Sequence, residues 1–166
     1  MAILDILTAP DPRLKQPAEP VADVAAIQSL IDDMLDTLYA TSHGIGLAAT
    51  QVGRSEALVI IDISEQRNEP LILINPEIVS GSDRVTGQEG CLSVPDYYAD
   101  VERYRQVTVT ALDRHGEQQT IQSDDFLAVV MQHEIDHLAG NLFIDYLSPL
   151  KRNMAFKKAA KAARQR

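Results

Sequence analysis

The segment His133-Glu134-Ile135-Asp136-His137 carries the strongest chemical signal in this chain of 166 residues. Two histidines four positions apart lie on one face of a helix, about one turn from each other, so both imidazoles can reach a single ion. Glu134 stands beside the first histidine, where a carboxylate can take a proton from a water that such an ion activates. The pattern therefore predicts a catalytic metal site.

The residues around this pair predict that the helix is buried. Apolar side chains occur on nearly every face of it, at Phe126, Leu127, Val129, Val130, Met131, Ile135 and Leu138. Two core histidines that bond only to the backbone would be the structural alternative. A buried glutamate flanked by two histidines needs partners, however, and a divalent ion supplies them.

A catalytic site of this type needs a third protein ligand and an open position. Glu, Asp, His or Cys can supply the ligand, and the single cysteine, Cys91, lies in the segment Glu89-Gly90-Cys91-Leu92-Ser93-Val94-Pro95. The glycine and proline of this segment predict a fixed, irregular backbone. A lone cysteine is often only a small buried hydrophobe. Next to a histidine pair that lacks a third ligand, we favour Cys91 as that ligand.

A third segment, residues 44–53, has the sequence Gly-Ile-Gly-Leu-Ala-Ala-Thr-Gln-Val-Gly. A phosphate-binding loop is disfavoured because no clear strand precedes it and no Lys-Ser or Lys-Thr pair follows. A helix stop followed by a tight, closely packed turn explains the glycines. The same small residues also let a substrate backbone approach, and Gln51 can present an amide donor there.

The elements that must position these segments predict an α+β fold. We expect short antiparallel or mixed sheets around a central metal-binding helix (residues 126–139), with an N-terminal helix (residues 21–41) and a C-terminal helix (residues 149–163). Strands are predicted at residues 57–62, 71–74 and 107–112, the last joined by a turn at 113–116 to a strand at 118–122. Residues 1–20 are expected to be extended and rich in turns. Residues 1–150 are expected to form the catalytic part of one domain, and residues 151–166 its basic helical tail.

Charge is distributed unevenly along the chain. The net charge is −9, yet residues 151–166 hold seven of the 15 Lys and Arg residues and none of the 24 Asp and Glu residues. The remainder would repel nucleic acid, whereas the tail can attract it without reading its sequence. No apolar run is long enough for a membrane helix, and the first residues do not look like a signal peptide. We therefore expect a cytoplasmic protein without a membrane partner.

Together the three segments resemble the three motifs of the peptide deformylases. Gly44-X-Gly46-Leu47-Ala48-Ala49-X-Gln51, Glu89-Gly90-Cys91-Leu92-Ser93 and Gln132-His133-Glu134-X-Asp136-His137 match in order and spacing. The likeness extends to Pro10-Asp11-Pro12-Arg13-Leu14, to Ile74-Asn75-Pro76 and to residues 145–150, so it covers nearly the whole chain. The bacterial form with a helical C-terminus is the most similar. The resemblance implies removal of the formyl group from the N-terminal formylmethionine of new polypeptides.

The resemblance also implies a role for individual residues. Cys91, His133 and His137 would bind one divalent metal ion per chain, Fe²⁺ in the cell, with Zn²⁺ or Ni²⁺ able to occupy the same site. Glu134 would act as general base and then acid, while the Leu92 backbone N–H and the Gln51 amide would stabilise the oxyanion. Peptide contacts would come from Ile45, Gly46, Gly90, Tyr98, Val129 and Val130. The basic tail would dock on the ribosome, since relatives with such a helix use it for that purpose.

One position departs from the family pattern. Many bacterial relatives have arginine where this chain has Tyr98, and tyrosine offers one donor and no charge. This leaves catalysis intact but makes the preference of the neighbouring peptide subsite uncertain. We expect Asp136 to have a structural role, with Arg103 as its candidate partner.

Two other function classes remain open from the sequence. His-Glu-X-X-His also occurs in zinc endopeptidases, although these usually take a further ligand downstream, and the 29 residues after His137 contain no His and only one acid, Asp145. A non-enzymatic homologue that binds metal or ribosomes is the second alternative. The intact Glu134 argues against it.

Overall fold

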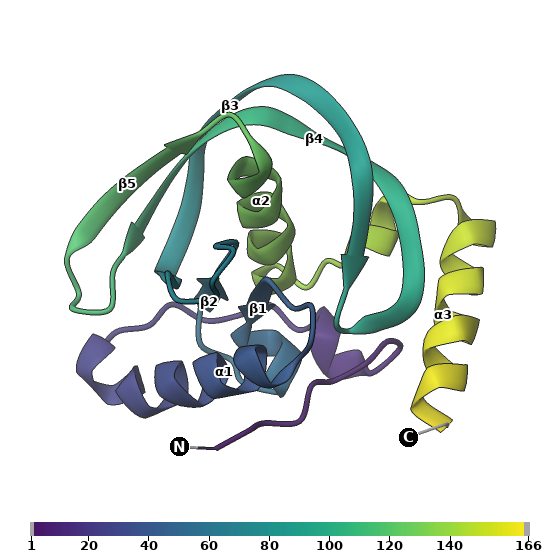
Figure 1. The fold of residues 1–166 in the computed structure, drawn as a ribbon, viewed down its shortest axis with the longest axis horizontal. Coiled ribbons are helices and arrows are strands. Elements are labelled where there is room, and N and C mark those ends of the chain that lie inside the picture. The colour runs from purple at the N-terminus through teal and green to yellow at the C-terminus, as the bar shows by residue number, and fades with distance from the viewer. Residues whose placement is uncertain (1, 165–166) are drawn as a thin grey trace.

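A five-stranded antiparallel sheet wraps around one buried helix (Figure 1). The computed structural model describes residues 2–164. Its strands, in the sheet order β1-β2-β3-β4-β5, are Gly46–Ala48, Leu58–Ile61, Leu71–Cys91, Val94–Leu112 and Gln118–Ser123. The helices are α1 (Gln28–Ala40), α2 (Phe126–Leu138) and α3 (Pro149–Arg164). The predicted α+β class is confirmed.

Strands β3 and β4 are much longer than the short runs predicted at 71–74 and 107–112. They pair from Ile74 with Leu112 to Cys91 with Val94, interrupted by three register irregularities. Such irregularities bend and twist a strand pair, and the two strands arch over α2 in Figure 1. Much of the β3 segment between residues 77 and 89 is exposed. Its strand pairing therefore has no apolar alternation that the sequence could reveal.

The segment that contains Cys91 is the tip of this long hairpin. We predicted an irregular backbone there, but β3 runs to Cys91 and β4 begins at Val94, so only Leu92 and Ser93 form the turn. The hairpin carries Cys91 to one end of the ribbon. It thereby places the thiol against the helix that holds the two histidines.

Helix α2 is buried as its all-round apolar composition predicts, and both of its ends are defined by local chemistry. The Asp125 side chain accepts a hydrogen bond from the backbone N–H of Leu127, and Gly140 follows the helix with a φ of 84°. The Gln132 amide fixes the helix against β4: Oε1 accepts from the Tyr104 N–H at 2.9 Å, and Nε2 donates to the Tyr104 carbonyl at 2.8 Å. These bonds set the position of α2 relative to the sheet.

The N-terminal helix is shorter than the predicted span of residues 21–41. A 3₁₀ turn (Val24–Ile27), capped by Asp23, precedes α1, and Ile27 has φ −107° and ψ 12°, outside the helical region. The apolar periodicity is nevertheless correct, because Ile27, Leu30, Ile31, Met34 and Leu38 are all buried in one cluster. Residues 46–52, predicted as a turn, form β1 and a 3₁₀ turn (Ala49–Val52), with Gly53 in the left-handed region at φ 77°.

Helix α3 packs against the body of the protein along a small apolar face. Ala155 and Ala159 are fully buried, in a cluster with Phe143, Ile144 and Val101. The basic segment predicted as a tail is thus held by apolar contacts as far as residue 164. Arg166 lies outside the described residues. Within the described part of the chain, no helix is long and apolar enough to cross a membrane.

Candidate metal centre and active site

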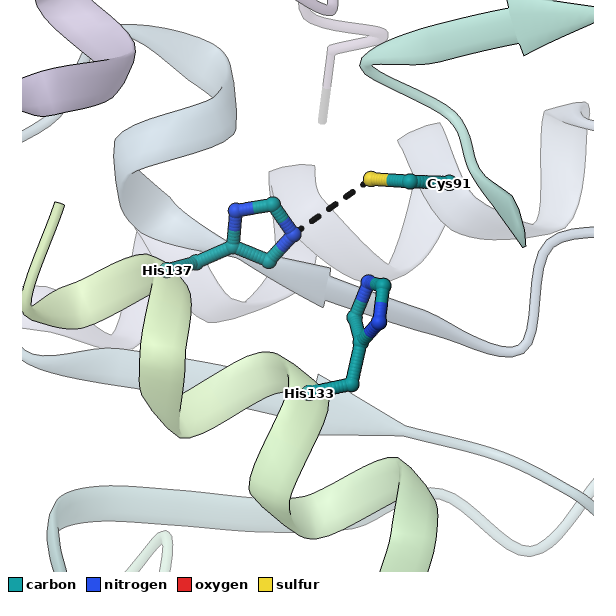
Figure 2. Close-up of side chains that lie close together, drawn as sticks. All are labelled: Cys91, His133 and His137. Atoms are coloured by element: carbon teal, nitrogen blue, oxygen red, sulfur yellow. Dashed lines mark hydrogen bonds between the residues drawn. The ribbon is translucent and has the colours of Figure 1, made fainter. Parts of the chain in front are cut away.

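The predicted ligands Cys91, His133 and His137 come together although 42 residues separate the cysteine from the first histidine (Figure 2). One ligand atom from each lies within 4.8 Å of the other two. Cys91 Sγ is 3.4 Å from His137 Nε2. The two imidazole rings, one turn apart on α2, have centroids 5.0 Å apart and meet edge to face at 69°. Two imidazoles and a thiol that converge in this way form a donor set typical of Zn²⁺, Fe²⁺ or Ni²⁺ sites.

The charges around these residues also fit a bound cation. Burial favours the neutral form of His133, but Cys91, Glu89 and Glu134 outweigh it and raise the pKa of His133 well above its ordinary value. Burial, aided by the charge of His133, lowers the pKa of His137 well below its ordinary value. The centre thus favours one positive charge held among anions, which a divalent ion supplies, and it keeps His137 in the neutral, ligating form.

The orientation of His133 is set by a partner outside the donor set. Its Nδ1 lies 2.9 Å from Glu89 Oε1, so its Nε2 is left for the metal side. Metal-binding histidines commonly have such a carboxylate partner, which fixes the ring and increases its basicity. Sequence reasoning placed Glu89 inside the cysteine motif but assigned it no role. Its position two residues before Cys91 puts it on the same hairpin tip.

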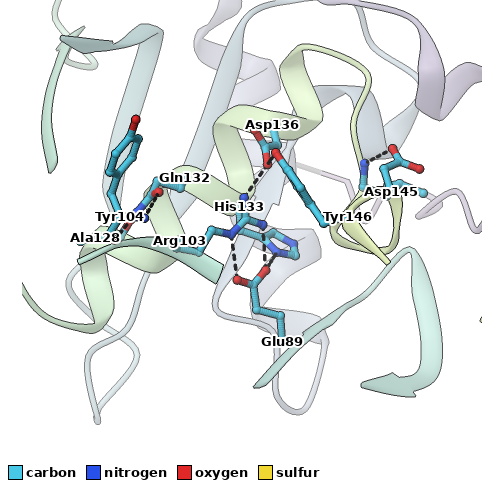
Figure 3. Close-up of polar contacts among 10 residues, drawn as sticks. Glu89, Arg103, Tyr104, Ala128, Gln132, His133, Asp136, Asp145 and Tyr146 are labelled. Atoms are coloured by element: carbon cyan, nitrogen blue, oxygen red, sulfur yellow. Dashed lines mark hydrogen bonds and ion pairs between the residues drawn. The ribbon is translucent and has the colours of Figure 1, made fainter. Parts of the chain in front are cut away.

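Glu89 is itself held by a buried network of charged groups (Figure 3). Arg103 donates to both Glu89 oxygens, at 2.8 and 2.9 Å, and to Asp136 at 2.6 Å. Tyr146 donates its hydroxyl to the same Asp136 oxygen at 2.7 Å. Burial alone would raise the pKa of Glu89, but the bonds from Arg103 and His133 hold it below its ordinary value. The predicted pair of Asp136 with Arg103 is confirmed.

We expect the change Arg103→Met to destabilise the fold by roughly 3–5 kcal/mol, because it leaves the buried Glu89 carboxylate without its main counter-charge. Urea unfolding measures this loss. The matched control is Arg54→Met, whose partner Glu56 is paired at 2.7 Å on the surface, so it should cost at most about 1 kcal/mol. Equal stability of both variants and the parent would show that the network does not support the fold.

A cavity of about 440 Å³ opens beside the metal centre. Nearly all the predicted substrate and catalytic positions line it: Ile45, Gly46, Gly90, Leu92, Tyr98, Val129, Val130 and Glu134, together with Cys91 and His133. Residues at positions 126, 129, 130, 133 and 134 share one face of α2, so the helix presents apolar side chains near the mouth and chemical groups farther in. The cavity has the size of a small-molecule or peptide subsite.

Glu134 lies at the inner end of this cavity with a carboxylate oxygen available. Its Oε1 is buried, and no hydrogen-bond partner for it occurs among the described residues. Burial raises the pKa of Glu134 to about 7, while His133 opposes this rise. A β-carbon at position 46 would lie 2.5 Å from Glu134 Oε2. Glycine at this position is thus needed for Glu134 to reach the cavity.

Gln51 lies near the centre but behind the cavity wall. Its Oε1 accepts from the Ala48 N–H at 2.9 Å, which leaves Nε2 as the free end. This Nε2 donates to Ser93 Oγ at 3.0 Å and lies 3.5 Å from Cys91 Sγ. Sequence reasoning did not single out Ser93, a buried residue whose only signal was its place two positions after the cysteine. The structure therefore orients the amide toward the metal centre, and its role toward substrate stays a prediction.

Comparison with known proteins identifies the family. The profile of the family described as polypeptide deformylase matches residues 3–153. A protein called peptide deformylase 2 from Vibrio parahaemolyticus is 71% identical over 161 residues, which cover 97% of this chain and 96% of the relative. A second protein of that name, from Vibrio cholerae, is 68% identical over 166 residues, which cover all of this chain and 99% of the relative.

Solved structures agree with this assignment. The crystal structure of a peptide deformylase from Legionella pneumophila superposes with a TM-score of 0.94 at 48% identity, covering 99% of this chain and 97% of that one. A peptide deformylase from Ehrlichia chaffeensis in complex with actinonin gives a TM-score of 0.93 at 40% identity, covering 99% of both chains. With the converging Cys91, His133 and His137, these matches show that the chain belongs to the polypeptide deformylase family.

Proposed function

We propose that this protein hydrolyses the formyl amide at the N-terminal formylmethionine of newly made polypeptides, using one divalent metal ion. The observation that carries the proposal is the convergence of Cys91, His133 and His137 beside Glu134 at the inner end of an open cavity. When bound there, a divalent ion lowers the pKa of a water and polarises a carbonyl. Members of the family match over the full length of the chain.

The residues of the chain supply the proton transfers and the charge stabilisation. Glu134 accepts the proton of the attacking water and delivers it to the departing amine, so the formyl C–N bond breaks and formate leaves. The Leu92 backbone N–H and the Gln51 amide donate to the oxyanion that develops on the formyl oxygen. Gln51 must exchange Ser93 Oγ for that oxygen. The distance of 3.0 Å between these two groups shows the bond that has to be replaced.

The cavity walls fit an extended formylmethionyl peptide. Ile45, Val129 and Val130 offer apolar surface for the methionine side chain. β1 pairs with β2 on one side only, so the strand edge at Ile45 and Gly46 can bond to a peptide backbone, as can Gly90 on the facing wall. A formyl carbon bears only hydrogen, so close packing around it excludes larger acyl groups.

Turnover of formyl-Met-Ala, compared with cleavage of an internal peptide bond, tests the proposal against its alternatives. A deformylase releases formate from the first substrate and leaves the second intact. Endopeptidase cleavage would support the zinc endopeptidase reading, and a metal-loaded protein without either activity would support a binding homologue. The third ligand favours the first outcome, because it is Cys91 from the preceding hairpin and no acid or histidine downstream of His137 belongs to the donor set.

We expect Gln51→Ala to lower kcat by roughly 10²–10³-fold, the usual loss when one oxyanion donor is removed. Steady-state kinetics on formyl-Met-Ala provide the measurement. Ser93→Ala is the matched comparison: it removes the hydroxyl that holds Gln51 Nε2 but keeps the amide. A Gln51→Ala variant in which only KM rises would assign Gln51 to substrate binding and not to the transition state.

For the metal, we propose Fe²⁺ in the cytoplasm of the cell, with Zn²⁺ or Ni²⁺ able to replace it. A thiolate with two imidazoles accepts all three ions, so the donor set alone does not select one. The support for iron comes from the family resemblance. Metal analysis of protein purified without oxygen, together with activity before and after exposure to air, distinguishes iron from the redox-inert zinc.

For the partner, we propose that α3 docks on the ribosome through its exposed cations. Lys151, Lys157, Lys158 and Lys161 are exposed, and no ion pair of theirs occurs within residues 2–164. The alternative, an electrostatic tether to the acidic body of residues 1–150, is disfavoured because the helix is held by buried Ala155 and Ala159. Deleting residues 151–166 would uncover that apolar cluster, so changes of charge are the better test.

We expect Lys157→Gln, Lys158→Gln and Lys161→Gln combined to weaken ribosome binding and reduce its salt dependence by roughly 0.7–0.9 in the log–log slope per lost phosphate contact. Turnover of formyl-Met-Ala should stay unchanged, since none of the three lysines lines the cavity. Sedimentation with ribosomes at several salt concentrations measures both quantities. Equal binding by the parent and the triple variant would remove the docking role.

A further inference from the structure

One tyrosine in this chain differs from the others in its surroundings. Three tyrosines carry an arginine over the ring: Arg67 lies 5.6 Å from the Tyr39 centroid, Arg84 lies 4.5 Å from that of Tyr104, and Arg103 lies 5.0 Å from that of Tyr146. Tyr97 packs against a core cluster. Tyr98 is 65% exposed, and within residues 2–164 no cation lies over its ring. Its ring surface is therefore available to a ligand.

Tyr98 stands at the wall of the active-site cavity, next to the metal centre. A β-carbon at position 90 would lie 2.5 Å from Tyr98 Cε1 and 2.6 Å from its Cδ1, so the ring rests directly on the Gly90 backbone. Gly90 precedes Cys91, and consecutive Cα atoms are about 3.8 Å apart. A peptide whose formyl group is held at the metal centre therefore passes Tyr98 within one or two residues of its methionine.

The charges on the cavity wall are all of one sign apart from the histidines. Glu89, Asp96 and Glu134 line it, and no Lys or Arg is present among the described residues that do so. Glu89 is paired with Arg103, and Glu134 is buried. Asp96 is exposed, two positions from Tyr98, at a φ of 64°. It is the acid that a substrate side chain near Tyr98 would meet.

We propose that Tyr98 and Asp96 select the side chains that follow formylmethionine, favouring lysine, arginine and aromatic residues and disfavouring aspartate and glutamate. This inference rests on the proposed deformylase function and specifies its substrate class. An open tyrosine ring attracts cations and stacks with aromatic side chains. Asp96 attracts the same cations and repels acids. A tyrosine–cation contact at an exposed site increases affinity about two- to fivefold, and an exposed ion pair contributes a similar factor.

Competition between short formyl peptides tests the proposal. We expect kcat/KM for formyl-Met-Lys-Ala to exceed that for formyl-Met-Asp-Ala by about tenfold at low salt, or the same contrast between formyl-Met-Ala-Lys and formyl-Met-Ala-Asp. Tyr98→Ala should reduce the ratio to that left by Asp96 alone, and Tyr98→Phe should preserve it because the ring face remains. Tyr98→Arg should reverse the preference toward aspartate.

Two further variants separate the ring from the charge. Asp96→Asn removes the charge while keeping a residue type that tolerates the left-handed backbone, and it should reduce the penalty for aspartate without removing the preference for aromatic residues. Tyr104→Phe, on β4 outside the cavity, is the control and should change no ratio. If neither position responds to Tyr98→Ala, Tyr98 does not select substrate. If no formyl peptide is turned over by the metal-loaded parent, the deformylase function itself fails.

Discussion

Glu134→Gln is expected to lower turnover of a formyl peptide by at least about 10²-fold while the metal content stays that of the parent. The amide keeps the shape of the side chain but cannot accept a proton from water or pass it to the departing amine, a function worth roughly 10²–10⁴ in rate. Metal is retained because Glu134 does not belong to the donor set of Cys91, His133 and His137. Steady-state kinetics and metal analysis of the same preparation provide the two measurements.

A matched control is Glu65→Gln, which changes an exposed acid outside the cavity and should leave both quantities unchanged. Glutamine also fits the existing space beside Gly46, so the variant does not introduce a new steric clash. A variant with a near-normal rate would remove Glu134 from the mechanism. Loss of metal together with activity would instead assign Glu134 to the metal site.

Cys91→Ser is expected to reduce metal affinity by at least about 10²-fold and to abolish most activity. A serine hydroxyl stays protonated near neutral pH and is a poor substitute for a thiolate toward Fe²⁺, Zn²⁺ or Ni²⁺. Even residues that only orient a ligand usually contribute 10–100-fold in affinity, so a lost ligand should cost more than that. Metal content after dialysis against a chelator measures this loss independently of activity.

Ser93→Ala serves as the control for this measurement. Its backbone N–H lies 3.4 Å from Cys91 Sγ, and this N–H remains in the alanine variant. Metal binding should therefore be close to that of the parent. Full occupancy in Cys91→Ser would show that the cysteine is not a ligand and that the donor set includes another group.

The residue types at positions 91, 133, 134 and 137 made the reaction class predictable without coordinates. Helical periodicity alone places His133 and His137 on one face, because residues four apart are neighbours in any α-helix. The α+β class was also accessible, since apolar periods and turn residues are local properties of the chain. Nearly every predicted cavity residue then proved to line one cavity.

The length of β3 and β4 was not predictable from local patterns. Their pairing between residues 77 and 106 rests largely on backbone hydrogen bonds across an exposed ribbon, which have no apolar alternation to reveal them. The role of Glu89 was hidden for a related reason. It depends on Arg103 and His133, which are 14 and 44 residues away in the chain.

The two adjacent tyrosines show the same division. Either Tyr97 or Tyr98 might equally face substrate when only their positions are known, because successive side chains of a strand point to opposite sides and the register decides which side is which. In the folded protein Tyr97 packs against the apolar cluster near α3, and Tyr98 lines the cavity. Local residue chemistry thus specified the metal centre and the reaction. Long-range strand pairing decided which side chains surround the centre, because contacts between distant segments exist only after the chain has folded.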